Sequence, residues 1–248
     1  MALALSVEDV GKDFLIPVID RVSFTAEAGE FVCLLGPNGC GKTTLLRIVG
    51  GLEPATRGRV TLGGDVIVAG RRHQRRVGVV FQEDRLLPWM TLKDNVELVL
   101  RPLGLDASAR GAVARRYLKI AGLGGFEEYH PAKVSGGMRQ RAAIARALAI
   151  EPDVLLMDEP FGALDAQNRR IMQNEVRRIW RETGRTILFV THAIDEAVAI
   201  GTTLVMLSAR PARIRELIKN DGRTDRAKLI DDLNTMIMEE VERQQGAS

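Results

Sequence analysis

Residues 36–43 read Gly-Pro-Asn-Gly-Cys-Gly-Lys-Thr, which fits the pattern G-x-x-x-x-G-K-[ST] at every fixed position. The apolar run Phe31–Leu35 before it predicts a buried strand. Residues 44–49, which are followed by Gly50 and Gly51, predict a helix after it. The pattern is meaningful only between a strand and a helix, and both are predicted here. We therefore expect a loop that binds the phosphates of a nucleoside triphosphate.

The residue types of this loop suit phosphate. Glycines let successive backbone N–H groups point inward, and the following helix N-terminus adds partial positive charge. Lys42 supplies a charge for the β- and γ-phosphates, and the Thr43 hydroxyl can ligate Mg²⁺. A dinucleotide-binding loop is disfavoured because Thr44 occupies the third glycine position. The predicted ATP-binding residues here are Gly36, Pro37, Asn38, Gly39, Cys40, Gly41, Lys42, Thr43 and Thr44.

A second apolar run, Val-Leu-Leu-Met at 154–157, ends in Asp158 and Glu159. Ligands bind at the carboxyl ends of parallel strands, and alternating side chains should give the two acids different tasks. We expect Asp158 to hold Mg²⁺ through water and Glu159 to polarise the water that attacks the γ-phosphate. Two acids at an exposed strand end are the alternative, which the phosphate loop disfavours.

Composition sets the limits of the fold. The 248 residues are 46% hydrophobic and 27% charged, which suits one large domain or a main domain with a smaller lobe. The net charge of +3 is too small to indicate nucleic acid. No apolar run approaches the roughly 18 residues of a membrane span, and the first residues lack the basic start of a secretory signal. The two cysteines do not suggest a disulfide framework, which favours a location in the reducing cytoplasm.

The order of apolar patterns predicts an α/β fold. Short continuous runs indicate strands of a mainly parallel sheet, and alternation near 22–24 and 60–68 indicates an antiparallel β subdomain. The other runs of the parallel sheet are 154–157, 187–190 and 204–207. Residues 91–149 predict an inserted helical subdomain between core segments 1–90 and 150–212. Residues 213–248 predict a charged C-terminal extension, interpreted as a solvated terminal helix.

A second anion-binding helix start is predicted at Ser135-Gly136-Gly137, before an alanine-rich helical run. The chain already has its own phosphate loop, so the economical interpretation is that this end serves a second copy of the chain. Thr191-His192 ends a later strand, where an imidazole could reach the γ-phosphate. Gln82 follows the apolar run 77–81 at the entrance to the helical segment.

Together these motifs resemble the ATP-binding-cassette (ABC) ATPases over about residues 3–212. The family's motifs occur here in its order: the phosphate loop, Gln82, Val-Ser-Gly-Gly-Met at 134–138, the acids at 158–159, Ala-Leu-Asp at 163–165, and His192. The resemblance implies a P-loop ATPase that forms a head-to-tail homodimer, with ATP between the two chains. It also implies that Phe14 stacks on adenine, with a core role as the alternative.

The roles that the resemblance implies fall into three groups. The catalytic residues would be Glu159, His192, Gln82 and Lys42. The residues that reach the partner's ATP would be Ser135, Gly136, Gly137, Met138 and Asp165. The Mg²⁺ ligands would be Thr43, Gln82 and Asp158.

The sequence departs from the commonest ABC pattern at two places, and one of them indicates a particular branch of the family. Val134 and Met138 replace the usual leucine and glutamine of the signature, and with Leu-Leu-Pro-Trp at 86–89 this resembles the nitrate, alkanesulfonate and taurine import branch. Ala193 stands where that branch carries aspartate. The resemblance implies an importer ATPase on the cytoplasmic face of the membrane. Residues 82–90 would contact permease subunits, and a substrate-binding protein would act indirectly.

Two other classes remain as alternatives. One is a non-transport ABC protein that acts on nucleic acid or ribosomes. Such proteins usually carry two cassettes or a long coiled-coil insertion, which this sequence lacks. The other is a P-loop kinase, which would have no use for Ser135-Gly-Gly137 or for His192.

Overall fold

The computed structural model describes residues 2–71, 77–162, 164–222 and 224–246. The chain forms two compact units: the first combines Met1–Arg75 with Arg185–Ser248, and the second is Arg76–Gly184. No helix among the described residues combines the length and apolar character that a membrane span requires.

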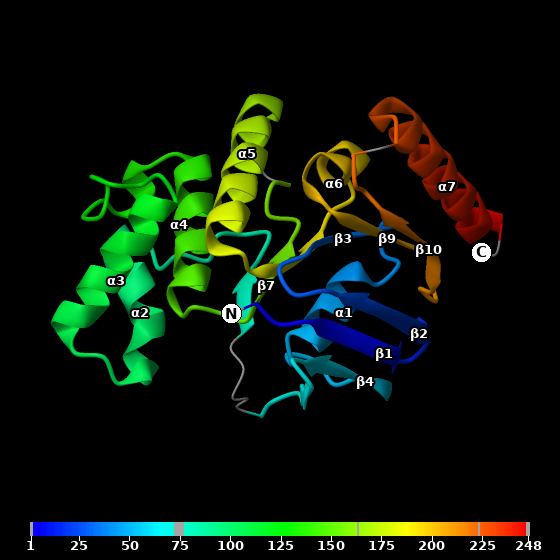
Figure 1. Ribbon diagram of the computed structural model, residues 1–248, viewed down its shortest axis with the longest axis horizontal. Helices are drawn as coiled ribbons and strands as arrows, with labels where there is room; N and C mark the ends of the chain where they lie inside the picture. Colours follow the sequence, from blue (N-terminus) through cyan, green and yellow to red (C-terminus); the bar gives the residue numbers. More distant parts are fainter. Residues whose placement is uncertain (1, 72–76, 163, 223, 247–248) are drawn as a thin grey trace. The chain divides into compact units, whose positions relative to one another are not determined.

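The first unit contains an antiparallel sheet with the strand order β2-β1-β4-β5 (Figure 1). Its strands are β1 (Leu5–Asp13), β2 (Pro17–Ala26), β4 (Arg57–Leu62) and β5 (Asp65–Val66). Val7 lies opposite Phe24 on one side and Val60 on the other, and all three side chains are buried. Alternate residues in these parts of β1, β2 and β4 therefore build one apolar face, as the sequence predicted.

The same unit contains neighbouring strands in the order β10-β9-β3-β8. β3 (Phe31–Leu35), β8 (Thr186–Val190) and β9 (Thr203–Leu207) are parallel and buried along their whole length. Continuous apolar sequence is what such doubly covered strands require, so these predictions are confirmed. Helices α1 (Lys42–Val49) and α6 (Ile194–Ile200) follow β3 and β8.

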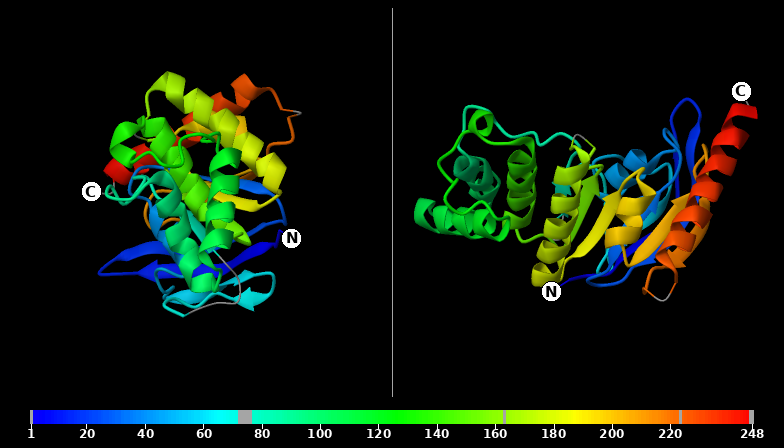
Figure 2. Two further views of the ribbon diagram at one scale, coloured as in Figure 1. Left: turned by 90° about the vertical axis from the view of Figure 1, so that its left-hand side faces the viewer. Right: turned by 90° about the horizontal axis from the view of Figure 1, so that it is seen from above.

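The prediction of a terminal helix from residue 213 is wrong for its first part. Residues Ile214–Lys219 form β10, which pairs antiparallel with β9, and only Arg226–Gly246 form the helix α7. β10 mixes charged and apolar side chains, which an edge strand tolerates because one of its sides faces solvent. α7 lies beside β10, where Arg215 donates to the Met236 carbonyl at 2.8 Å (Figure 2).

The second unit contains two parallel strands and most of the helices. β6 (Val77–Val80) pairs with β7 (Val154–Asp158). Three helices pack on one another, namely α2 (Leu92–Leu100), α3 (Ala107–Ile120) and α4 (Gly136–Ala149). α5 (Ala166–Thr183) completes the unit, and short 3₁₀ turns lie at Arg101–Leu103 and Pro131–Lys133. Side-chain caps start the four α-helices at Thr91, Asp106, Ser135 and Asp165.

Candidate functional site

The phosphate loop joins β3 to α1 in the first unit. Its backbone requires glycine at Gly41, where φ is 123° and an added Cβ would lie 3.1 Å from Val18 Cγ1. Only glycine combines that conformation with so close an approach. The sequence pattern therefore corresponds to a real backbone requirement at this position.

No side chain among the described residues caps the N-terminus of α1, whereas side chains cap α2, α3, α4 and α5. The first N–H groups of a helix lack partners within the helix, and the macrodipole makes this end partly positive. A helix start that no side chain closes suits an anion. The loop thus meets the main physical requirement of a phosphate site.

Lys42 is 5% exposed, and its ammonium donates to the Gly36 and Pro37 carbonyls, at 2.9 Å each. The same loop contains Cys40, which is buried. Burial raises the pKa of the Cys40 thiol, although the charge of Lys42 opposes the change. The thiol is therefore neutral at physiological pH, and the ammonium supplies the positive charge of the loop.

Phe14 lies between β1 and β2 and is 58% exposed, so the alternative of a core phenylalanine is wrong. Lys12 Nζ sits 4.6 Å from the centre of its ring, and Lys12 is itself paired with Glu53 at 2.6 Å. A ring with one open face is what stacking against a planar base requires.

His192 is the second residue after β8 and is exposed. Its neighbour Thr191 is buried, donates to Glu196 Oε2 at 2.7 Å and accepts from the Ala193 N–H at 3.0 Å. These bonds fix the turn that carries the imidazole. Alanine at 193 takes part in this turn through its backbone, so the departure from the family's aspartate leaves the turn intact.

In the second unit, Asp158 is the last residue of β7, and Glu159 follows with φ of 42°. This left-handed conformation costs an ordinary residue about 1–2 kcal/mol. Such backbone strain is concentrated at functional sites, where the surrounding structure maintains it. Both side chains are partly exposed, as groups that meet a ligand must be.

Ser135 is the N-cap of α4, and its Oγ accepts from the Met138 N–H at 3.2 Å. Gly136 and Gly137 form the first turn, as predicted for a helix start. Within 4 Å of an added Cβ at Gly137 there is no described atom. The glycines therefore leave the side of this helix end open to an approaching group.

A groove of about 620 Å³ in the second unit brings Gln82 together with Gly136. Pro160 and Leu164 line the same groove. Asp165 N-caps α5, and the Asn168 N–H that donates to it at 2.9 Å lowers the pKa of its carboxyl. Ala163 of the predicted Ala-Leu-Asp motif lies outside the described residues.

The segment after Gln82 is held by residues that sequence reasoning missed. Asn95 is completely buried, and both polar atoms of its side-chain amide form hydrogen bonds. Its Oδ1 accepts from the Leu87 N–H at 2.7 Å, and its Nδ2 donates to the Thr91 carbonyl at 2.9 Å. Trp89 is 71% exposed, whereas Leu86 is buried. The sequence did contain one sign of this role: asparagine has a low helix propensity, so its presence inside a predicted helix suggests a specific hydrogen-bonding function.

Arg146 anchors the same segment by donating to the carbonyls of Asp84, at 2.8 Å, and Arg85, at 2.7 Å. Burial lowers the pKa of Arg146, although the guanidinium stays charged at neutral pH. Arg139 adds an ion pair with the Asp84 carboxylate at 3.0 Å. The helix that carries the predicted signature thus also holds the segment that follows Gln82.

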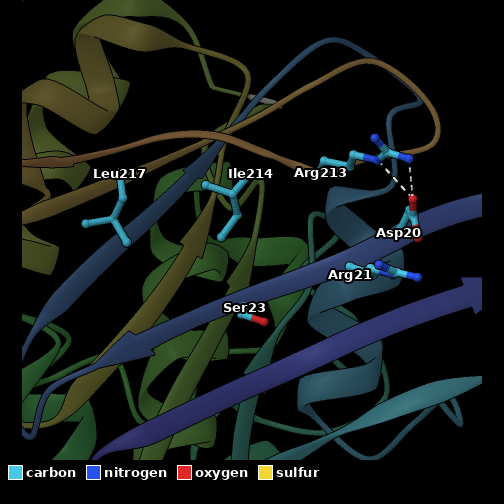
Figure 3. A pocket seen from close by; sticks show the side chains of 6 residues that line it. All are labelled: Asp20, Arg21, Ser23, Arg213, Ile214 and Leu217. Atoms are coloured by element: carbon cyan, nitrogen blue, oxygen red, sulfur yellow. Dashed lines mark hydrogen bonds and ion pairs between the residues drawn. The ribbon is translucent and has the colours of Figure 1, made fainter.

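Another groove, of about 630 Å³, lies in the first unit between β2 and β10 (Figure 3). Asp20 on its wall accepts from Arg213 Nε at 2.9 Å and is also paired with Arg57. None of its lining residues was predicted as a site residue. Its lining consists of Asp20, Arg21, Ser23, Arg213, Ile214 and Leu217.

The predicted residues are thus divided between the units. The first unit carries residues 36–44 of the loop with Phe14 and His192. The second unit carries Gln82, Ser135, Gly136, Gly137, Met138, Asp158, Glu159 and Asp165.

Comparisons with known proteins agree with this arrangement. Residues 19–162 match the family model described as ABC transporter. The chain is 46% identical over 213 residues to the taurine import ATP-binding protein TauB of Burkholderia pseudomallei, which covers 86% of this chain and 81% of that protein. It is 40% identical over 233 residues to the aliphatic sulfonates import ATP-binding protein SsuB of Bacillus cereus, with 91% and 90% covered.

A solved structure gives the same result for the fold. A dimeric ATP-binding cassette in a post-hydrolysis state, bound to ADP and Pi, superposes with a TM-score of 0.75 and 29% identity, covering 88% of this chain and 99% of the other. The α/β P-loop fold is therefore confirmed. The kinase alternative is wrong, and the nucleic-acid alternative is not favoured. The chain belongs to the ABC transporter family, as an ATP-binding subunit whose ATPase activity is coupled to transport.

Proposed function

We propose that this ATPase energises the import of a small sulfonated organic anion such as taurine or an alkanesulfonate. The observation that carries the proposal is the 46% and 40% identity to import subunits named for those compounds, over most of the chain. The substrate class rests on these relatives alone, because selectivity would lie in the permease and binding protein.

The phosphate loop is proposed to bind the triphosphate of ATP through residues 36–44. Support comes from the helix start that no side chain caps and from the Lys42 ammonium held inside the loop. Phe14 is proposed to stack on adenine with its exposed ring face.

Glu159 is proposed as the general base for the attacking water, with His192 and Gln82 orienting the γ-phosphate and that water. Thr43, Gln82 and Asp158 offer a hydroxyl, an amide and a carboxylate oxygen, the donor types that Mg²⁺ prefers. When bound, Mg²⁺ would neutralise charge on the β- and γ-phosphates.

The ATP sites are proposed to be completed by a second copy of the chain. Ser135, Gly136, Gly137 and Met138, with Asp165, would face the partner's ATP. The open side of Gly137 supports this role, and so does the dimeric state of the similar cassettes. ATP would then hold the dimer together, and hydrolysis would release it.

The partner outside the dimer is proposed to be a permease, contacted by residues 82–90 at the cytoplasmic face of the membrane. Exposed Trp89, on a segment fixed by Asn95 and Arg146, is a rigid aromatic anchor of the kind that interfaces favour. A substrate-binding protein would act through the permease, and no nucleic acid is expected.

The proposed domain organisation is a single ABC ATPase domain, residues 1–248. Its core would comprise 1–90 and 150–212, its helical lobe 91–149 and its C-terminal extension 213–248.

Uptake measurements test the transport proposal. A strain that lacks this chain should lose uptake of radiolabelled taurine or alkanesulfonate, and the parent chain should restore it. The Lys42→Ala chain should not restore it, which separates ATP-driven import from a passive role. Normal sulfonate uptake in the deletion strain, together with lost uptake of nitrate, would reject the sulfonate assignment.

A further inference from the structure

The loop between β9 and β10, residues 208–213, contacts the phosphate loop through one side chain. Arg210 donates from Nη2 to the Gly39 carbonyl at 2.7 Å. The two residues are separated by 171 positions in sequence, and both are exposed. The phosphate loop is also held from within by Lys42, which donates to the Gly36 and Pro37 carbonyls.

This contact fixes the direction of a peptide group that a phosphate site needs. In a trans peptide the carbonyl and the following N–H point in opposite directions. Holding the Gly39 carbonyl outward therefore sets the direction of the Cys40 N–H. That N–H now has a long bond of 3.3 Å to the Pro37 carbonyl, which a phosphate oxygen can replace. Gly39 has φ of 74° and no Cβ, so its peptide has little rigidity of its own.

The loop that carries Arg210 is fixed at both ends. The Ser208 N–H donates to the Arg213 carbonyl at 2.9 Å, which closes the loop. The Ala212 N–H donates to the Val18 carbonyl at 2.9 Å, and Arg213 is paired with Asp20 on β2 (Figure 3). Arg210 therefore projects from a rigid base.

A further anchor comes from α7. Glu240 is 3% exposed, and its Oε2 accepts from the Ala209 N–H at 2.9 Å. Its Oε1 accepts from Arg215 and Arg243, at 2.9 Å each. A buried carboxylate with all these partners holds its position strongly, because moving it would leave a charge without compensation. α7 thus connects to the residue next to Arg210.

From this chain of contacts we infer that Arg210 is a positioning residue for the phosphate loop and that Glu240 of α7 holds Arg210 in place. The inference rests on the proposal that residues 36–44 bind ATP. It assigns the C-terminal helix a role in nucleotide affinity rather than in catalysis.

The test compares steady-state KM and kcat with the Kd for ATP of the full-length subunit. Arg210→Ala should weaken ATP binding roughly fivefold to tenfold, in line with the net contribution of one solvent-exposed hydrogen bond, and should change kcat by less than about twofold. Arg210→Lys, which keeps a donor and the charge, should recover part of the affinity. Glu240→Ala should act in the same direction. Its effect should largely disappear in the Arg210→Ala background, because both act through one contact.

Two control variants separate this role from general stabilisation. Arg59→Ala removes an exposed arginine that is paired with Glu8 instead. Glu239→Ala removes the neighbouring carboxylate of α7, which pairs with Arg215 but does not contact Ala209. Both should keep the parent KM. Thermal unfolding without nucleotide should shift no more for Arg210→Ala than for Arg59→Ala, because each variant loses one exposed contact.

The results for Arg210→Ala and Lys42→Ala distinguish failure of this inference from failure of the phosphate-loop proposal. An unchanged KM in Arg210→Ala, alongside lost binding in Lys42→Ala, overturns the inference and leaves the phosphate-loop proposal intact. Parent-like binding in Lys42→Ala would instead refute the phosphate-loop proposal. Equal effects of Glu239→Ala and Glu240→Ala would reduce Glu240 to a packing role.

Discussion

Glu159 is the residue where backbone strain and proposed chemistry coincide. Its φ is 42°, and it directly follows the strand β7. Changing it to glutamine keeps the size of the side chain and removes its ability to accept a proton. We expect turnover of Glu159→Gln to fall by about 10²- to 10⁴-fold, measured as phosphate release, with affinity for ATP unchanged or increased.

The control for this variant is Asp158→Asn. Loss of the proposed Mg²⁺ ligand should weaken productive nucleotide binding as well as turnover. Size exclusion at equal protein concentration should show Glu159→Gln as a dimer with ATP and a monomer with ADP. Turnover at a substantial fraction of the parent rate would remove Glu159 from the role of base.

At the scale of single residues, the sequence predicted those functional residues that belong to short motifs. Lys42 and Ser135 belong to short patterns that fix their own surroundings, and the structure places them as those patterns require. Arg210 and Asn95 act on backbone carbonyls and amides of other segments. Any residue type offers those groups, so no pattern identifies the partner before the fold is known.

At the scale of elements, α2 fixes the segment proposed to meet the permease. Asn95→Ala would leave the Leu87 N–H without its side-chain partner, at a cost of about 1–3 kcal/mol of unfolding free energy. We expect the isolated subunit to keep most of its ATPase activity, while transport by the complete system falls. The exposed Asn174→Ala, on α5 of the same unit, is the matched control. Full transport by Asn95→Ala would contradict a positioning role for this segment.

The attachment of β10 gives a prediction for pH dependence. Glu30 accepts from Lys219 Nζ at 2.6 Å and from Thr203. Burial alone would raise the pKa of Glu30, but the hydrogen bonds from Lys219 and Thr203 lower it below the ordinary value of 4.5. Because the folded-state pKa is the lower one, the carboxylate stabilises the fold above pH 4.5, and this contribution is lost as the pH falls below that value.

Glu30→Gln should therefore lower stability at neutral pH by about 1 kcal/mol and flatten the loss of stability at acidic pH. Chemical denaturation at a series of pH values measures both effects. Glu216→Gln, an exposed carboxylate on β10, should leave the pH profile unchanged. A Glu30→Gln profile that runs parallel to that of the parent would exclude Glu30 as the titrating group.

Helices and strands were predicted correctly where the pattern of apolar residues fitted only one type of secondary structure. The buried parallel strands read as continuous apolar runs, and the antiparallel ones alternate. β10 failed this criterion because its apolar residues, Ile214, Leu217 and Ile218, have the i, i+3, i+4 spacing of an amphipathic helix. Residues 214–219 form a strand because they pair with β9. Such pairing depends on the tertiary structure, so the local sequence does not reveal it.

At the scale of the whole molecule, the sequence predicted an inserted helical segment, and the structure confirms helices α2, α3 and α4 within it. The compact second unit extends further, from Arg76 to Gly184, because it also contains β6, β7 and α5. The sequence offered no sign of this, since the strands of both units read alike as buried apolar runs.

The proposed dimer is tested by a substitution at the start of α4. Ser135→Arg places a bulky cation where the partner's ATP would lie, so hydrolysis should be lost while each chain still binds nucleotide. The change also removes an N-cap, worth about 1 kcal/mol. Asp106→Arg removes the N-cap of α3 equally and should retain hydrolysis, which separates the two effects.

Mixing Ser135→Arg chains with Lys42→Ala chains completes the test, because each variant alone has two defective sites per dimer. In a mixed dimer, the intact phosphate loop of the Ser135→Arg chain faces the intact Ser135 of the Lys42→Ala chain, and the other site carries both defects. Equal mixing makes half of the dimers mixed, so about a quarter of the parent activity per chain should return if the two sites act independently. Recovery in the mixture, and not in either variant alone, would establish that the nucleotide site is built from two chains. Parent-rate hydrolysis by Ser135→Arg alone would mean that one chain is sufficient.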